Sequence, residues 1–284
     1  MKKKKTHKTV TKRKPLKKTR PVRKAAPAGR FSPEVKVSPD LNTLYHDVAD
    51  LFVKAAKEAV MTRGRFMVAL SGGDGPVGLF QLLATEPYLS DVPWDKACVF
   101  WGDDRHVPLD HPDSNYKMCL DLLLSRTTVP PARLFPMTDA SMPPAKAAAQ
   151  YEKTLRRLFG GKGLPVLDFN LMGLGPDGHT ASLFPGRPQL REKRKWVVGY
   201  HVDAERRDRV TLTFPVLNAS RLTVALIPGN KKARILKDVL EGDCDPKRYP
   251  IQNLKAVPGG RLLFALDGAA AVLLKVKTEP LGEI

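Results

Sequence analysis

An imidazole and a carboxylate stand two residues apart in a glycine-rich stretch, residues 168–186, that reads DFNLMGLGPDGHTASLFPG. The pair is Asp177 and His179, and an imidazole oriented by a carboxylate is a usable general base near neutral pH. The apolar run Asp168–Met172 predicts a buried strand, which puts the pair at the strand's carboxyl end, where open α/β sheets bind ligands. Helix signals begin at Thr180. The glycine spacing alone also fits a strand–turn–helix connection with a polar loop histidine.

Three further turns follow apolar runs that predict strands, and each carries groups suited to a polar or anionic ligand. A glycine turn between a strand and a helix aims free backbone N–H groups and a positive helix end at an anion. The residues concerned are Ser71, Gly72 and Gly73, then Asp103, Asp104 and Arg105, and finally Lys232. Each turn alone also fits a solvated loop. Convergence on one sheet edge would make them a pocket.

The order of apolar and polar residues predicts strands that alternate with helices. Strands are expected at residues 34–37, 66–70, 97–101, 168–172, 196–201, 209–213, 222–227 and 261–266. Helices are expected at residues 39–64, 77–85, 115–124, 145–159 and 233–240, with a closing helix after Asp267. Ser38 is the expected N-cap of the first helix. This alternation predicts an α/β fold with a mostly parallel, Rossmann-like sheet that helices cover on both faces.

The net charge of +19 is concentrated at the start of the chain. Residues 1–30 hold 14 Lys and Arg and no acid, which leaves 34 basic against 29 acidic residues, or +5, for residues 31–284. The segment 1–30 is expected to be a disordered basic tail, and residues 31–284 a single α/β domain. Such a tail can bind nucleic acid through phosphates, or it can simply be a solvated extension. Neither a secretory signal nor a membrane-spanning run is expected.

The three cysteines, Cys98, Cys119 and Cys244, have no metal-ligand spacing. No other cluster has convincing ligand spacing either, so we expect neither a metal nor a cofactor. Cys98 lies in an apolar run and is expected to be a buried, reduced thiol in the cytoplasm. The oligomeric state cannot be read from these residues.

Five stretches resemble the 6-phosphogluconolactonase family, over about residues 34–275. They are LSGGDGP (70–76), FWGDDRHVPLDHPDSNY (100–116), GLGPDGHTASLFPG (173–186), RVTLTFPVLN (209–218) and GNKKA (229–233). The resemblance implies metal-free hydrolysis of 6-phosphoglucono-1,5-lactone to 6-phosphogluconate, in the oxidative pentose phosphate pathway. It also implies the sugar-phosphate isomerase/deaminase-type architecture that the family shares with glucosamine-6-phosphate deaminases.

The resemblance also implies a role for each candidate residue. His179 would take a proton from water, with Asp177 orienting its ring, and turn amides would stabilise the oxyanion. The phosphate-binding residues would be the cations Arg105, Arg209 and Lys232 and the cradle of Ser71, Gly72 and Gly73.

This sequence departs from the family pattern at two positions. Asp74-Gly75 stands where the family usually has Ser-Thr, which removes two hydroxyl donors and adds a carboxylate. Asp104 stands where the family usually has Glu. The first departure bears on substrate affinity, because a carboxylate pointing inward would repel phosphate.

Two other function classes stay open. An aminosugar-phosphate deaminase or isomerase would share the fold and use Asp103 as its base. A sugar-phosphate-binding regulator would bind ligand without turnover. The residues after the DGH turn, Thr180-Ala181-Ser182-Leu183-Phe184-Pro185, favour the lactonase over the deaminase.

Overall fold

The computed structural model describes residues 31–137, 140–203, 207–275 and 278–281. The chain from Phe31 onward forms one compact unit. The basic tail of residues 1–30 lies outside the described residues, so its expected disorder stays a prediction.

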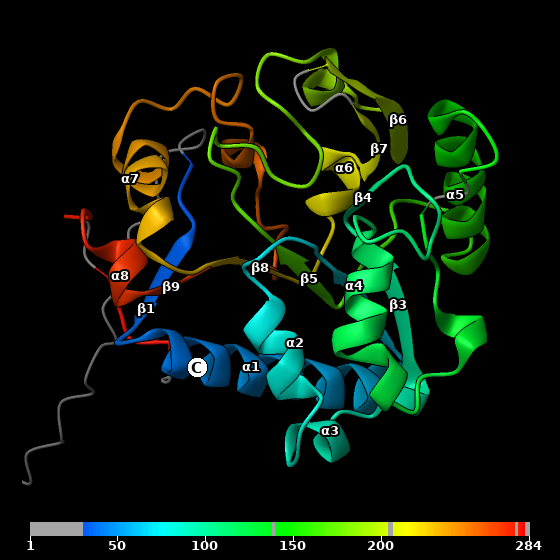
Figure 1. Cartoon of the computed structure of the whole chain (residues 1–284), viewed down its shortest axis with the longest axis horizontal. Helices are drawn as coiled ribbons and strands as arrows, with labels where there is room; N and C mark the ends of the chain where they lie inside the picture. Colours follow the sequence, from blue (N-terminus) through cyan, green and yellow to red (C-terminus); the bar gives the residue numbers. More distant parts are fainter. Residues whose placement is uncertain (1–30, 138–139, 204–206, 276–277, 282–284) are drawn as a thin grey trace, which may run out of the picture. The chain divides into compact units, whose positions relative to one another are not determined.

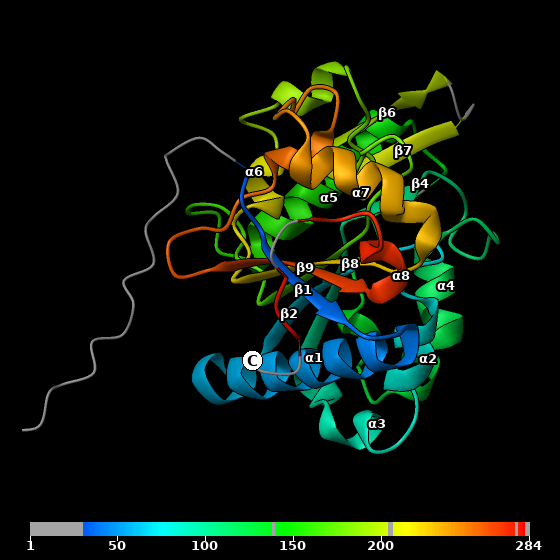
Figure 2. The same ribbon diagram turned by 90° about the vertical axis from the view of Figure 1, so that its left-hand side faces the viewer.

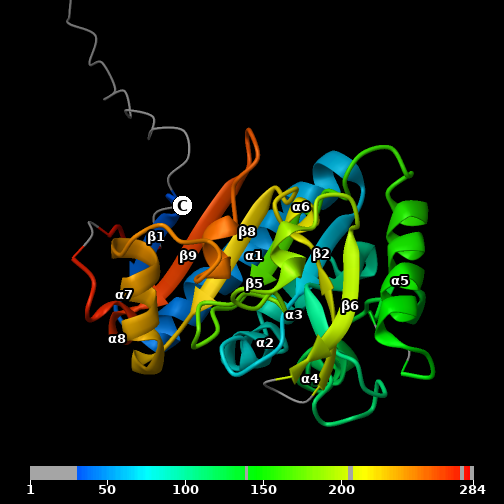
Figure 3. The same ribbon diagram turned by 90° about the horizontal axis from the view of Figure 1, so that it is seen from above.

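A six-stranded sheet, parallel throughout, forms the centre of this unit (Figure 1). Its order is β1 (Glu34–Ser38), β9 (Arg261–Asp267), β8 (Leu222–Ile227), β5 (Phe169–Met172), β2 (Phe66–Leu70) and β3 (Ala97–Trp101). Every residue of β2, β5 and β8 is buried, which explains why these strands are continuous apolar runs. Figure 3 shows these strands side by side from above.

Helices cover both faces of this sheet. The long helix α1 (Leu41–Arg63) packs Leu44, Val48 and Phe52 inward and lies on one face with α3 (Tyr88–Asp91). The helices α6 (Phe214–Leu217) and α7 (Ala233–Glu241) lie on the other face (Figure 2). The remaining α-helices are α2 (Val77–Leu83), α4 (Asn115–Leu122), α5 (Pro144–Leu158) and α8 (Gly268–Ala271).

A separate three-stranded antiparallel sheet has the order β4 (Asp103–Arg105), β7 (Arg207–Leu212) and β6 (Val197–Val202). Helix α5 packs against β6 and β7. The short strand β4 follows β3 after the single residue Gly102. The sequence predicted β6 and β7 as strands but read β4 as a loop, because three polar residues carry no strand signal of their own.

The predicted α/β fold with a mostly parallel sheet is confirmed, and the predicted strands and helices end within two residues of the observed ones. The predicted helix cap is wrong. Asp40, not Ser38, caps α1 by accepting the Thr43 N–H at 2.8 Å. Ser38 ends β1, and its hydroxyl donates to Asp47 instead.

Two further expectations are wrong. No helix begins at Thr180: its hydroxyl donates to the Gly173 carbonyl at 2.9 Å, and Ala181 takes a positive φ of 48°. The buried thiol is Cys119 rather than Cys98, which is half-buried. Burial raises the pKa of the Cys119 thiol. None of the helices described is long and apolar enough to cross a membrane.

Candidate active site

The predicted turns lie together because β2, β3, β5 and β8 are parallel and end at the same edge of the sheet. Several contacts join them. Gly102 N–H donates to the Leu70 carbonyl at 3.1 Å, which links the ends of β2 and β3. A Cβ placed on Gly75 would lie 3.5 Å from the Leu226 carbonyl oxygen, so the turn after β2 also abuts the end of β8.

The His179 ring is hydrogen-bonded to Asp177 through Nδ1 and Oδ1, 2.5 Å apart. This contact assigns the ring proton to Nδ1 and leaves Nε2 as the acceptor. Burial raises the pKa of Asp177, but the hydrogen bond and the charge of His179 lower it by more, so the net shift is downward. The carboxylate is therefore ionised near neutral pH, and the His179 side chain, 21% exposed, can reach solvent.

Close packing fixes the orientation of this ring. A Cβ on Gly175 would stand 2.2 Å from His179 Cε1 and Nδ1, so only glycine leaves room for the imidazole there. On another side, the Phe184 ring has its centroid 4.4 Å from that of His179. The Gly175 N–H also donates to the His179 carbonyl at 2.8 Å. The His179 ring is thus held by contacts within its own turn and with Phe184.

The small antiparallel sheet presents one polar face to this turn. Arg105, Arg209 and Tyr200 are aligned across β4, β7 and β6, and residues directly opposite in antiparallel strands share a face. Asp103, two residues before Arg105, has the same face and accepts the Ser182 hydroxyl at 2.5 Å. The Tyr200 hydroxyl donates to the Ser182 carbonyl. This face therefore meets the segment that carries His179.

Two of the predicted cations are oriented by this sheet. Arg105 donates from Nη1 to the Asp113 carbonyl at 2.8 Å, which fixes its guanidinium near the start of α4. Burial lowers the pKa of Arg209, and the charge of Asp103 opposes that shift. Arg209 stays charged near neutral pH.

Asp104 points to the opposite face and is fully buried. Its carboxylate accepts the backbone N–H groups of Arg105, Asn115 and Tyr116 at 2.8, 2.7 and 3.1 Å, and the Ser114 hydroxyl at 3.2 Å. Burial raises its pKa to about 6, although these donors pull the other way. This residue, a ligand-site candidate in the sequence, anchors the start of α4 instead.

Lys232 ends a short 3-10 helix, η6 (Asn230–Lys232), that follows β8. Burial lowers its pKa, while the charges of Asp74 and Asp177 raise it. Lys232 therefore interacts with the turn after β2 and the turn after β5 together. In the first of these turns Ser71 and Gly72 are partly exposed, and Gly73 and Asp74 are exposed. Lys232 thus lies near the turns that carry Asp74 and Asp177, and strand pairing places Arg105 beside Arg209, while Asp104 points to the opposite face of β4.

Sequence reasoning missed four residues at this edge: Asn115, Ser182, Phe184 and Tyr200. The first three lie inside the stretches that resemble the family, so the sequence marked their positions but did not indicate what each side chain does. Tyr200 had none, because its place beside Arg209 depends on pairing between β6 and β7. Burial raises the pKa of Tyr200 to about 12, so it keeps the proton that it donates.

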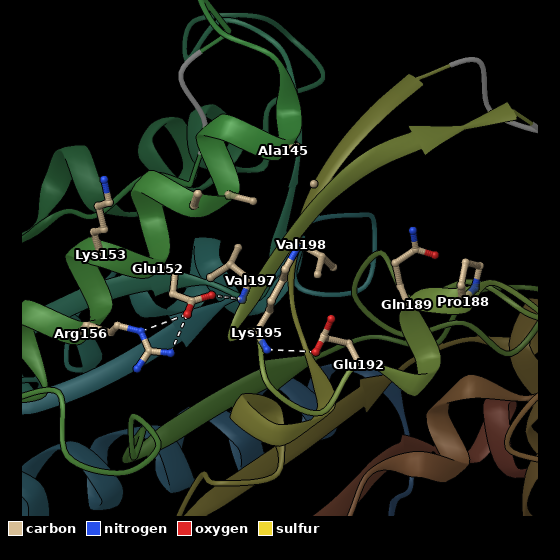
Figure 4. Close-up of a pocket in the computed structure, with 13 residues that line it drawn as sticks. Ala145, Glu152, Lys153, Arg156, Pro188, Gln189, Glu192, Lys195, Val197 and Val198 are labelled. Carbon is tan, nitrogen blue, oxygen red and sulfur yellow. Dashed lines mark hydrogen bonds and ion pairs between the residues drawn. The ribbon is translucent and has the colours of Figure 1, made fainter.

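One cavity of about 560 Å³ lies elsewhere, between α5 and β6 (Figure 4). Its lining includes Ala148, Glu152, Glu192 and Val197. Both glutamates are used internally. Glu152 binds Arg156 and the Trp196 N–H, and Glu192 accepts the backbone N–H groups of residues 193–195. None of the chemistry-bearing residues lines this cavity, so the residues at the sheet edge define the candidate site.

Among the residues that the structure describes, no three His, Cys, Asp or Glu side chains are grouped so that they could hold a metal ion. The expected absence of a cofactor stays a prediction.

Fold and site together define an α/β protein with a carboxylate-oriented histidine and several cations at the carboxyl edge of a parallel sheet. The sequence profile of the family described as "Glucosamine-6-phosphate isomerases/6-phosphogluconolactonase" matches residues 39–263, and the chain belongs to this family.

Relatives and solved structures agree with this assignment. The chain is 37% identical over 220 residues to "6-phosphogluconolactonase" of Synechocystis, covering 77% of this chain and 88% of that one. It is 36% identical to "Probable 6-phosphogluconolactonase 2" of Arabidopsis thaliana, and the match covers 78% of this chain and 87% of that one. The structure of 6-phosphogluconolactonase from Trypanosoma brucei matches with a TM-score of 0.72 at 26% identity, and the match covers 86% of this chain and 99% of that one. A monomeric glucosamine-6-phosphate deaminase, at 19% identity and a TM-score of 0.68, shares the fold.

The burial of Asp104 predicts a pH-dependent stability. Folded Asp104 keeps its proton up to pH about 6, whereas the unfolded residue loses it near its ordinary pKa of 3.8. Between these values the folded state binds more protons, so the free energy of unfolding should fall as pH rises, by roughly 3 kcal/mol for this group. Urea unfolding of the wild type and Asp104→Asn from pH 3.5 to 7 measures the difference.

Asp110→Asn is the matched control, because Asp110 is exposed. Its pH dependence should follow the wild type. Identical pH profiles for Asp104→Asn and the wild type would contradict the raised pKa.

Proposed function

We propose that this protein hydrolyses 6-phosphoglucono-1,5-lactone to 6-phosphogluconate, as in the oxidative pentose phosphate pathway. The observation that carries the proposal is the His179–Asp177 pair at the same edge as Arg105, Arg209 and Lys232. The names of relatives that cover most of the chain agree with it.

His179 acts as the general base in this proposal. Its Nε2 takes a proton from water as the oxygen bonds to the lactone carbonyl carbon, and Asp177 stabilises the imidazolium through Nδ1. The tetrahedral oxyanion then collapses, and the bond between the carbonyl carbon and the ring oxygen breaks. The imidazolium returns the proton to that oxygen, which restores the base and leaves the open-chain acid. Backbone N–H groups of the glycine turns stabilise the oxyanion.

The three cations and the cradle of Ser71, Gly72 and Gly73 bind the substrate phosphate. A dianion needs charge-assisted donors from more than one side. Arg105 and Arg209 come from neighbouring strands of the small sheet, and Lys232 comes from the turn after β8. Their separate origins favour a ligand that spans the edge between the two sheets.

The alternatives predict different products. An aminosugar-phosphate deaminase would release ammonia from glucosamine 6-phosphate, with Asp103 as base. Asp103 is only 8% exposed and accepts the Ser182 hydroxyl, which disfavours it as a base. A regulator would bind sugar phosphates without turnover.

The decisive assay follows acid release from fresh 6-phosphogluconolactone against the spontaneous rate. We expect a large acceleration, with no ammonia from glucosamine 6-phosphate. Binding without acceleration would favour the regulator and overturn this proposal.

We place the enzyme in the cytoplasm, in keeping with the free thiols Cys98, Cys119 and Cys244. If the protein binds nucleic acid, we expect the basic tail of residues 1–30 to make the contact, and its affinity should fall steeply as the salt concentration rises.

Replacement of the base should abolish most turnover. His179→Ala should lower kcat by about 100- to 10,000-fold, the usual contribution of a positioned proton acceptor. Steady-state kinetics and a thermal melt measure turnover and folding. His201→Ala is the matched control, because His201 also contacts a carboxylate, Asp208, but lies on the other face of the small sheet. Near-normal kcat in folded His179→Ala would reject His179 as the base.

Loss of any one of the three cations should impair hydrolysis of the phosphorylated lactone but not of the unphosphorylated one. Lys232→Ala, Arg105→Ala and Arg209→Ala should each lower kcat/KM for the phosphorylated lactone by roughly tenfold or more, from about 1.5–3 kcal/mol per charge-assisted bond. Unphosphorylated glucono-1,5-lactone should be hydrolysed almost as before. Lys231→Ala is the control, because this neighbouring lysine is exposed. Equal losses on both substrates would mean that the replaced residue does not read the phosphate.

Asp74 should weaken substrate binding through Lys232. Its charge interacts with that lysine, so it competes with the phosphate. Asp74→Ser should therefore lower KM for the phosphorylated lactone, and Asp74→Asn should do the same with nearly the same shape. An unchanged KM in both variants would show that Asp74 does not oppose the ligand.

A further inference from the structure

Asn115 is a buried residue of the DHPDSNY stretch to which the proposed reaction gives no role. It begins α4 and is only 3% exposed. Its Nδ2 donates to the Asp103 carbonyl at 2.9 Å. Its Oδ1 is closed off from solvent and has no hydrogen-bond partner within the described residues. The reversed amide would set two oxygens against each other at Asp103, so the hydrogen bond fixes this orientation.

The atoms around Asn115 Oδ1 belong to the glycine turn. A Cβ on Gly72 would stand 1.8 Å from Oδ1, 2.2 Å from Cγ and 2.8 Å from Nδ2 of Asn115, and these are its three nearest atoms. Gly72 does not have a positive φ, so a left-handed backbone conformation is not the reason for glycine at this position. The close approach of the Asn115 amide therefore leaves no room for a Cβ at this position.

This amide links three segments of the site. It contacts the turn after β2 through Gly72 and binds the Asp103 carbonyl in β4. The Asp103 carboxylate in turn accepts the Ser182 hydroxyl of the segment that carries His179. The Asn115 backbone N–H is held by Asp104, so the side chain projects from an anchored point.

We propose that Asn115 is the positioning residue that sets the distance between the glycine turn of residues 71–73 and the small sheet that bears Arg105 and Arg209. A shift of this turn moves its backbone N–H groups relative to the two guanidinium groups, so one phosphate can no longer contact both. The inference rests on the proposed function, because it assigns these groups to a sugar phosphate.

A double-mutant cycle tests the contact. Gly72→Ala should lower kcat/KM for the phosphorylated lactone by about tenfold or more, because the new methyl group displaces either the turn or the amide. Asn115→Ala removes the clashing atoms, so Gly72→Ala/Asn115→Ala should be no worse than Asn115→Ala alone. Glucono-1,5-lactone should suffer far less in every variant. Gly102→Ala is the control, since its Cβ would meet nothing closer than 3.7 Å.

The same cycle is measured as 6-phosphogluconate affinity by calorimetry and as melting temperature. Asn115→Ser replaces Asn115→Ala in the cycle if the alanine variant does not fold. Wild-type kcat/KM and affinity in Gly72→Ala would overturn the proposal. So would additive losses in the double variant, or equal losses on both lactones that follow the melting temperature. If the wild type fails to hydrolyse the lactone, the proposed function fails, and the affinity cycle still decides the role of Asn115.

Discussion

A buried hydrogen bond between Ser182 and Asp103 joins the two halves of the candidate site. His179, the proposed base, belongs to the connection after β5 in the parallel sheet, whereas the guanidinium groups of Arg105 and Arg209 belong to the separate antiparallel sheet. Parallel strands alone bring the turns to one edge but do not set their distance from a second sheet. A charge-assisted bond between buried partners does this, because loss of either partner leaves the other without its hydrogen bond inside the protein.

Two adjacent carboxylates, Asp103 and Asp104, have different surroundings because they lie on opposite faces of one strand. Asp103 and Asp104 are neighbours, and in β4 their side chains alternate between opposite faces. Asp103 faces the segment that carries His179, while Asp104 binds three backbone N–H groups and the Ser114 hydroxyl. The sequence predicted one polar turn for both residues and did not indicate which of them faces the site. The two side chains point to opposite faces because β4 is a strand. That strand forms by pairing with β7, about a hundred residues later in the chain, so the local sequence does not reveal it.

The sequence predicted the parallel sheet well because each buried strand is a local apolar run. It also predicted which turns meet, since parallel strands share an edge. It failed where distant contacts override local signals. Thr180 has helix signals nearby, yet its hydroxyl bonds back to Gly173 and Ala181 adopts a positive φ. Asn115 stood inside a family stretch, but its role depends on the approach of Gly72, which no spacing rule reveals.

The cavity between α5 and β6 illustrates why enclosed volume is a poor guide to this site. Its lining includes alanine and valine side chains, and its two glutamates bind neighbouring protein groups (Figure 4). A sugar phosphate is small and polar, so its recognition needs convergent donors and charges rather than a deep apolar space. The sheet edge supplies Lys232 beside the charges of Asp74 and Asp177, and a His179 ring packed between Gly175 and Phe184. In the proposed reaction, this charged edge attracts the phosphate dianion, while the packing around His179 keeps the proton acceptor in one orientation.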